Sequence, residues 1–213
     1  MLKPSDQEYQ ITKKIKLGKS AIDEKFAPFV DWINAKYNVE ILNILSDTID
    51  SNTTRLKLIF ERQNDVDVFL LKNKFSQSSR KERSIINQYK HLFKVEDMDS
   101  ILILFYAFEP LAREEAVTSM PLKVKNTFKE KHKADLWEVA VFGEYVTFFF
   151  FTHEDLKKAE QKKQTAIIKQ EYYNLLKPYD EFNYFNPANF NAVFDSKENF
   201  DQHYDSNWRW YYS

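Results

Sequence analysis

This chain has almost no glycine and no cysteine, which limits both the turns that it can form and the chemistry that it can perform. Its 213 residues include two glycines, Gly18 and Gly143, and no cysteine. A phosphate-binding loop or a dinucleotide fingerprint needs several glycines, because the backbone must approach the phosphate closely. Without cysteine there can be no thiol nucleophile, disulfide, cysteine-ligated zinc or iron–sulfur cluster. No motif in the sequence therefore identifies a reaction.

The composition is that of a folded domain rather than a disordered chain. Hydrophobic residues make up 43% and charged residues 30% of the sequence, and a chain of this length buries about 70% of its unfolded surface. Folding therefore needs no metal, and we expect no cofactor. The formal net charge is −1, whereas nucleic-acid-binding domains carry a basic excess, so nucleic acid is not expected as a partner.

Neither a targeting segment nor a membrane span is expected. The first ten residues, MLKPSDQEYQ, lack the apolar region of a secretory signal. The longest apolar stretch, residues 139–151, is interrupted by Gly143 and Glu144, and it is shorter than the roughly 20 residues that a membrane helix needs. We therefore expect a cytoplasmic protein with no membrane partner.

The spacing of apolar residues predicts an α+β fold, in which helices pack on a mixed or mainly antiparallel sheet. The element order is roughly αβββαβ-αα-ββα, followed by an aromatic C-terminal extension. The expected helices are residues 21–37 (kinked at Pro28 or beginning near it), 79–93, two stretches on either side of Pro121, and 152–176. The expected strands are residues 39–45, 55–61, 66–71, 101–108, 136–142 and 145–151. Each half of the sequence has a helix followed by a hairpin, although the halves share negligible identity.

Two regions of the predicted sheet carry more specific expectations. Residues 101–108, ILILFYAF, are apolar on both faces, which is typical of a central strand covered above and below. Residues 136–142 and 145–151 are joined by Gly143 and Glu144. A glycine at the first of two central residues predicts a hairpin with a type II′ turn.

The chain is expected to have three parts. Residues 1–19 are polar and lysine-rich and are predicted to be an N-terminal arm. Residues 20–178 are predicted to form a single α+β domain, because no Gly-, Ser- or Pro-rich linker divides them. Residues 179–213 form an aromatic, acidic segment that is predicted to pack on that domain.

Two polar clusters have ordinary structural interpretations. His153, Glu154 and Asp155 follow a buried strand, where active-site residues often lie, but Thr152 followed by Asp155 is also a helix cap. Lysines are dense in residues 123–133, but glutamates are interleaved with them, which is typical of a solvated helix face. We favour the cap and the solvated face over a catalytic or phosphate-binding role.

Asp201, His203 and Asp205 could ligate a metal ion. On a strand, their alternate positions would place all three side chains on one face. Metal sites draw ligands from several elements, so this triplet also fits a solvated polar face. A metal-dependent hydrolase or nuclease with a dispersed carboxylate and histidine site is one alternative function.

The first part of the predicted element order, αβββαβ, resembles in topology the core of the PD-(D/E)xK nucleases. Those enzymes hold a divalent ion with an Asp on one strand and a (D/E)-x-K triplet on the next. The corresponding hairpin here offers Glu61, Asp65, Asp67 and Lys72, and neither strand contains the triplet. The resemblance is one of fold alone, and we assign no family.

The C-terminal segment contains the strongest candidate for a binding surface. The spacing of Phe190 and Phe194, and that of Phe200, Tyr204 and Trp208, predicts two short amphipathic helical turns. The segment either completes the core or leaves its last aromatic residues exposed as an interface. Trp, Tyr and Arg are the residues that most often anchor interfaces. The candidate binding residues are Trp208, Arg209, Trp210, Tyr211 and Tyr212.

The leading prediction is a non-enzymatic, intracellular protein-binding module. It would use the C-terminal segment to bind a partner protein or to form a homodimer. Besides the metal-dependent hydrolase or nuclease, the second alternative is a small-ligand binding domain with an aromatic pocket.

Overall fold

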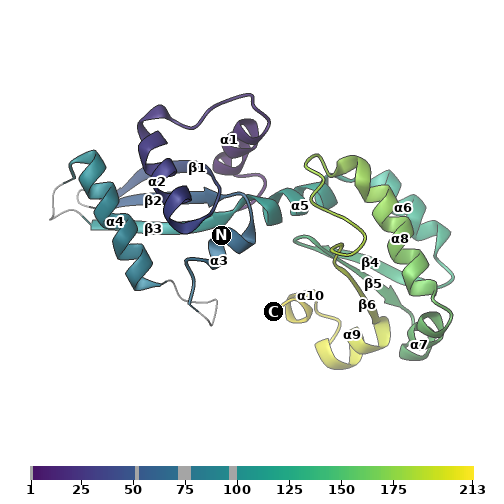
Figure 1. Ribbon diagram of the computed structural model, residues 1–213. Coiled ribbons are helices and arrows are strands. Elements are labelled where there is room, and N and C mark those ends of the chain that lie inside the picture. The colour runs from purple at the N-terminus through teal and green to yellow at the C-terminus, as the bar shows by residue number, and fades with distance from the viewer. Residues whose placement is uncertain (1, 51–52, 72–77, 96–99) are drawn as a thin grey trace. The chain divides into compact units, whose positions relative to one another are not determined.

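The computed structural model describes residues 2–50, 53–71, 78–95 and 100–213 of the chain (Figure 1). It confirms the α+β fold, with helices packed against two three-stranded sheets. The chain divides into two compact units, Met1–Leu111 and Ala112–Ser213. Compact units need not fold independently, so the single domain of residues 20–178 stays a prediction.

The first unit is built around a sheet in the order β1-β2-β3. Its strands are β1 (Ile41–Asp50), β2 (Thr53–Phe60) and β3 (Ser100–Ala107). β1 is antiparallel to β2, and β2 is parallel to β3. The helices are α1 (Gln7–Lys16), α2 (Ala27–Tyr37), α3 (Gln63–Asp67), α4 (Ser79–Phe93) and the start of α5 (Phe108–Ser119), with a 3₁₀ turn at Glu24–Phe26.

Alternation along β2 decides which helices cover which face of this sheet. Leu56 and Leu58 are buried in one core with side chains of α2 and α4. Arg55 and Lys57 lie on the opposite face, where Lys57 donates a hydrogen bond to Glu8 of α1. Because strand side chains alternate between the two faces, the sheet has one apolar face and one partly polar face.

The residues predicted to be a polar N-terminal arm contain helix α1. Tyr9 and Thr12 lie three residues apart on one face of α1, and both are fully buried. Thr12 accepts a hydrogen bond from the Asn43 side chain of β1 at 3.0 Å, and the Tyr9 ring stacks on Phe108 at 5.1 Å. This part of the arm therefore belongs to the packing of the first unit.

The strand predicted at residues 66–71 is wrong: α3 continues to Asp67, residues 68–69 form a turn, and Leu70 makes an isolated bridge. The Asp65 carboxylate accepts a hydrogen bond from the backbone N–H of Arg62 at 3.2 Å, which caps a short helix. Val66 and Phe69 then lie three residues apart and both enter the core. The hairpin of this unit is β1–β2, so the αβββαβ order of the nuclease resemblance is not found in the described residues.

The central position predicted for residues 101–108 is also wrong, because β3 lies at the edge of the described sheet. Ile103 and Ala107 are buried on the apolar face, whereas Leu102 on the other face is 40% exposed. Leu102 is paired in register with Arg55, on the partly polar face. An apolar run therefore does not by itself distinguish a central strand from an edge strand.

The second unit repeats the topology of the first. Its sheet has the order β4-β5-β6, with an antiparallel pair followed by a parallel pair. The strands are β4 (Leu136–Phe142), β5 (Tyr145–Phe150) and β6 (Ala192–Ser196). The helices that follow the end of α5 are α6 (Leu122–Lys131), α7 (His153–Gln161), α8 (Gln164–Leu176), a 3₁₀ turn at Lys177–Tyr179, α9 (Lys197–Tyr204) and α10 (Trp208–Tyr211). In the described residues of both units, two α-helices lie between the hairpin and a third strand that runs parallel to the second.

One face of the second sheet packs against α6, α7 and α8. Phe148 and Phe150 of β5 enter a core with Phe128 of α6 and with Ile168 and Tyr172 of α8. These side chains are apolar or aromatic and close-packed, so this face is a conventional hydrophobic core.

Two local predictions in the second unit differ from the structure. The single helix predicted at residues 152–176 is divided into α7 and α8 at Lys163, whose φ of +58° is left-handed. The helical turn predicted at Phe190 and Phe194 is wrong, because Phe194 lies in β6 beside Phe148 of β5. A parallel pairing between segments so far apart in sequence leaves no local signal.

The hairpin between β4 and β5 is confirmed. Phe142 pairs with Tyr145 across a two-residue turn, and Gly143 has a φ of +57°. Glu144 is not in the left-handed region, which fits type II′ and not type I′. Glu144 also forms an ion pair with the buried Arg113 of α5 at 2.8 Å, which holds the turn in place.

Replacing Gly143 by valine should destabilise the protein by about 1–3 kcal/mol, because a left-handed φ is costly for a β-branched residue. A Cβ at this position would meet nothing within 4 Å, so the cost is conformational rather than steric. Chemical denaturation measures it. Gly143→Asn is the control and should lose less stability, since asparagine tolerates this region. An unchanged midpoint for the valine variant would show that the turn is assigned incorrectly.

Candidate interaction surface

Helices α9 and α10 lie on the second face of the β4–β5–β6 sheet, across the sheet from α6 and α8 (Figure 1). Ser196 starts α9, because its hydroxyl accepts a hydrogen bond from the Asn199 N–H at 3.1 Å. Asn207 starts α10 in the same way, accepting from the Arg209 N–H at 2.9 Å. Helices this short are not stable alone, so their position depends on packing against the sheet.

A layer of aromatic rings joins the two helices to the sheet. Phe149 of β5 and Phe200 of α9 are buried at its base. The Trp208 ring lies 4.2 Å from Phe200 and 5.4 Å from Phe149, measured between ring centroids. Trp208 is also parallel to Trp137 of β4, at 6.1 Å and 6°. Such edge and stacked contacts add to the burial of apolar area, so they fix the orientation of Trp208.

Two tyrosines extend this layer and are held by their hydroxyl groups. Tyr211 donates a hydrogen bond to the Asp195 carboxylate of β6 at 2.7 Å. Burial, followed by this contact with Asp195, raises the pKa of Tyr211 well above its ordinary value. Burial also raises the pKa of Tyr212, whose hydroxyl lies 3.5 Å from the Thr147 hydroxyl. Both phenols therefore remain protonated near neutral pH.

Four large aromatic side chains remain exposed at the outer side of this layer, and we call them the aromatic patch. They are Phe142 and Trp210, each 54% exposed, Tyr145 at 47% and Trp208 at 39%. Phe142 stacks on Tyr212 at 4.6 Å and 9°, and Tyr145 lies opposite Phe142 in the hairpin. Most of the patch is thus continuous with the packed layer beneath it.

The five predicted binding residues fall into two groups. Trp208, Tyr211 and Tyr212 pack against the sheet or its aromatic layer. Arg209 and Trp210 are exposed on α10. The hairpin also contributes to this surface, which the sequence pattern of the C-terminal segment did not indicate. The aromatic residues on either side of the Gly143 turn are a signal that could have indicated it, since hairpin ends are solvent-exposed.

The structure does not bring Asp201, His203 and Asp205 together as metal ligands. Asp201 pairs with Lys197 and accepts a hydrogen bond from Ser206 at 2.6 Å. His203 is exposed on α9, and Asp205 ends that helix with a φ of +48°. Among the residues that the structure describes, no group of three or more His, Asp or Glu side chains could hold a metal ion.

The residues considered for a nuclease site do not share a hairpin. Glu61 follows β2 and is buried, and its carboxylate pairs with Lys16 of α1 at 2.7 Å. Asp65 and Asp67 lie on α3. Lys72 lies outside the described residues.

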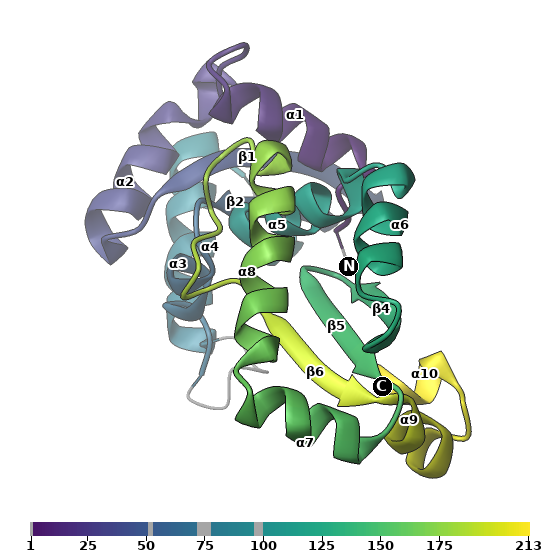
Figure 2. The ribbon, with the colours of Figure 1, turned by 90° about the vertical axis from the view of Figure 1, so that its right-hand side faces the viewer.

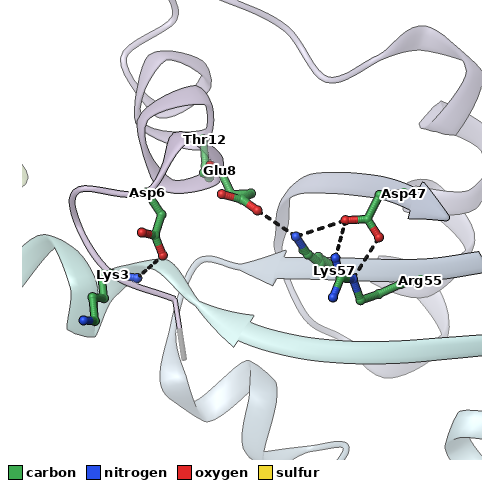
Figure 3. Close-up of polar contacts among 7 residues, drawn as sticks. All are labelled: Lys3, Asp6, Glu8, Thr12, Asp47, Arg55 and Lys57. Atoms are coloured by element: carbon green, nitrogen blue, oxygen red, sulfur yellow. Dashed lines mark hydrogen bonds and ion pairs between the residues drawn. The ribbon is translucent and has the colours of Figure 1, made fainter. Parts of the chain in front are cut away.

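A second polar cluster, in the first unit, consists of alternating charges (Figure 3). Lys57 contacts Glu8 at 2.7 Å and Asp47 at 3.3 Å, measured from its ammonium nitrogen to the carboxylate oxygens. Arg55 holds Asp47 in a bidentate pair at 2.8 and 2.6 Å. Two cations thus balance two anions on the partly polar face of the sheet. We call these four residues the charge network.

The charge network has the electrostatics of a structural cluster. The hydrogen bond from Arg55 lowers the pKa of Asp47, and the hydrogen bond from Lys57 lowers the pKa of Glu8. Glu8 in turn raises the pKa of Lys57. A general acid or base needs a pKa shifted towards the working pH, whereas here each shift moves away from neutrality.

The junction of β5 and α7 has the predicted helix cap. The Thr152 hydroxyl accepts a hydrogen bond from the Asp155 N–H at 3.1 Å, which confirms the cap. The Glu198 carboxylate accepts from the His153 N–H at 3.0 Å. These contacts satisfy N–H groups at the start of α7 and tie it to α9.

Comparisons with protein-family models, with curated proteins and with solved structures give no significant match. In the described part of the chain, no helix combines the length and the apolar character that crossing a membrane requires. The interpretation of this surface therefore depends on its own geometry.

The two tryptophans of α10 should respond differently to truncation. Trp208→Ala removes a ring packed against Phe149, Phe200 and Trp137 and should cost about 2–3 kcal/mol. Trp210→Ala removes an exposed ring and should change the free energy of unfolding by less than about 0.5 kcal/mol. Chemical denaturation of both variants gives the comparison. Equal losses would contradict the division of α10 into a packed side and an exposed side.

The charge network should make stability depend on pH in the acid range. The pKa values of Glu8 and Asp47 are lowered on folding from ordinary values of 4.5 and 3.8, so their contribution is complete above these values. It is lost as the pH falls through the folded pKa values, because the carboxylates then become protonated. Asp47→Asn should have a lower melting midpoint at pH 7 and a flatter decline below about pH 3.8, the ordinary pKa of the carboxylate that it removes.

Asp31→Asn is the matched control, since it removes an exposed carboxylate of α2 that is not in the charge network. Its melting midpoint should follow that of the unmodified protein at each pH. If Asp47→Asn and Asp31→Asn gave the same pH profile, the charge network would not contribute to stability.

Proposed function

We propose that this protein is a non-enzymatic, intracellular protein-binding module that binds its partner through the aromatic patch and Arg209. The main support for this proposal is the exposure of two side chains on the outward side of α10. Trp210 is 54% exposed beside the exposed Arg209, although the aromatic layer beneath α10 is already complete without these two side chains. Their exposure has no structural benefit within the unit.

The composition of this surface fits an interface. Single exposed apolar side chains are common, but a group of large ones is typical of a binding surface. Trp, Tyr and Arg also supply most of the affinity in measured interfaces. The patch together with Arg209 combines these three residue types, with Trp208, Trp210, Tyr145 and Arg209 all exposed.

Two rings of the patch, Trp208 and Phe142, are already packed before any partner binds. Trp208 is stacked between Trp137 and Tyr212, at 6.1 Å from each. Phe142 is fixed by its stack on Tyr212. A side chain that is already ordered loses little conformational entropy on association, which favours affinity.

The partner that suits this surface is another protein, either a second copy of the chain or a different one. Several acidic residues lie on β6 and α9 (Asp195, Glu198, Asp201 and Asp205). Their charge disfavours a phosphate backbone, so nucleic acid is not proposed. A cytoplasmic location belongs to the same proposal. No observation of comparable weight supports a metal-dependent hydrolase.

Substituting the exposed pair on α10 tests this function. The full chain is studied by sedimentation for self-association and by photo-cross-linking from position 213, an exposed position next to α10, for a different partner. Trp210→Ala and Arg209→Ala should each weaken association about tenfold or more, as expected for hot-spot residues. Both variants should keep the melting midpoint of the unmodified protein.

Ile49→Ala is the matched control, because Ile49 is a large, half-exposed residue of β1 outside the patch. It should leave association unchanged. The proposal fails if the chain neither self-associates nor cross-links from position 213. It also fails if Ile49→Ala weakens association as much as Trp210→Ala does.

A further inference from the structure

A second surface of the Ala112–Ser213 unit has the properties of a docking site. Helices α6 and α8 lie next to each other on the face of the sheet opposite the aromatic patch (Figure 2). Between them is a groove of about 540 Å³ that is open to solvent. Its lining residues are Lys123, Val124, Thr127, Phe128 and Lys131 of α6, with Glu171, Asn174 and Leu175 of α8.

The floor of the groove is apolar and already formed. Phe128 is buried there, and its ring is held by Tyr172 at 5.1 Å and by His132 at 4.6 Å. Val124 lies four residues before Phe128 on the same face of α6, and Leu175 faces them from α8 and is 36% exposed. The groove therefore offers apolar area without a rearrangement of its rings.

The charge at the rim of the groove is positive. Glu171 is the acidic side chain among the lining residues, and its carboxylate is contacted by Lys131 and His132, each at 2.8 Å. Lys123, at the other end of the groove, is exposed and has no ion-pair partner among the described residues, so a carboxylate of a partner can pair with it.

We propose that the α6–α8 groove binds an acidic amphipathic helix of a partner protein. Apolar side chains spaced by about one turn would contact Val124, Phe128 and Leu175, which is the usual mode of a helix in a groove. Acidic residues flanking them would pair with Lys123. The charge of the rim thus selects an acidic helix over a basic one.

The shape of the groove favours a helix over a small molecule. Small-ligand pockets enclose most of the ligand surface, whereas this groove is open along two exposed helices. Its α6 side extends from Lys123 to Lys131, a rise of about 12 Å at 1.5 Å per residue. Leu122 and Ile167, exposed by 72% and 56% on α6 and α8, supply additional apolar surface on the same two helices.

This site is independent of the proposed function of the aromatic patch, since the two surfaces lie on opposite faces of one sheet. If both are used, the unit can hold two partners at once. Trp210→Ala should accordingly leave binding in the groove unchanged.

The direct test uses a synthetic helical peptide of about 16 residues, because shorter helices are marginal in water. It carries Leu at helical spacing on one face and Glu on the other. A matched peptide carries Lys in place of Glu. Fluorescence anisotropy with the full chain should show the acidic peptide binding about tenfold or more tightly than the basic one, with an affinity that falls as salt is raised.

Substitutions in the groove identify the site. Lys123→Glu should weaken the affinity for the acidic peptide about tenfold. Leu175→Glu should abolish binding of this peptide. Lys157→Glu is the matched control, because it makes the same charge change at an exposed position of α7 and should have little effect. Circular dichroism of each variant establishes that the fold is retained.

Three results would overturn the proposal. The first is equal binding of the acidic and the basic peptide, or no binding of either. The second is an equal effect of Lys123→Glu and Lys157→Glu. The third is saturable binding of a small apolar anion such as octanoate that depends on Lys123 and excludes the peptide, because the groove would then be a small-ligand site.

Discussion

Closing the second face of a three-stranded sheet is the requirement on which the rest of this structure depends. A sheet of this width cannot remain stable with one apolar face open to water. In the second unit the first face is closed by the core around Phe148, and the second is closed by α9 and α10 through Phe149, Phe200 and Trp208. The many aromatic residues in 179–213 are therefore explained first by the need to cover this sheet face.

The two units solve this requirement with the same topology but with different chemistry. In the first unit α1 covers the partly polar face, and charges there are balanced in pairs such as Glu8 with Lys57. In the second unit the cover is aromatic, and a polar contact such as Tyr211 with Asp195 is added at its margin. On the polar face of the first unit, the charges are paired within the unit. The aromatic cover of the second unit instead leaves large rings exposed to a partner. This difference is why the interaction surface is proposed on the second unit.

Local signals in the sequence were sufficient for much of the fold. Gly143 predicts its turn because a left-handed φ is required there, and Thr152 predicts the start of α7 because a cap is a contact between neighbours in sequence. The strand β6 could not be predicted in this way, since its parallel pairing with β5 joins segments more than 40 residues apart. The apolar run at residues 66–71 was misleading although the deciding contact is local: capping by Asp65 selects a helix that continues into the run. For the candidate site, the sequence indicates which residues are aromatic, but it does not show that Tyr211 packs against the sheet, because its contacts with Phe149 of β5 and Asp195 of β6 are distant in sequence.

The most direct test of the account is the solvent accessibility of the individual tryptophans, measured by ¹⁹F NMR of the full chain labelled with 5-fluorotryptophan. Trp→Phe variants assign the signals of Trp137, Trp208 and Trp210. The account predicts that a soluble paramagnetic agent broadens the Trp210 signal most and the Trp208 signal much less, and that Trp208→Phe shifts the signal of Trp137, on which it stacks. Equal broadening of Trp208 and Trp210, with no shift of Trp137, would show that α10 is not packed on the sheet and would contradict the account.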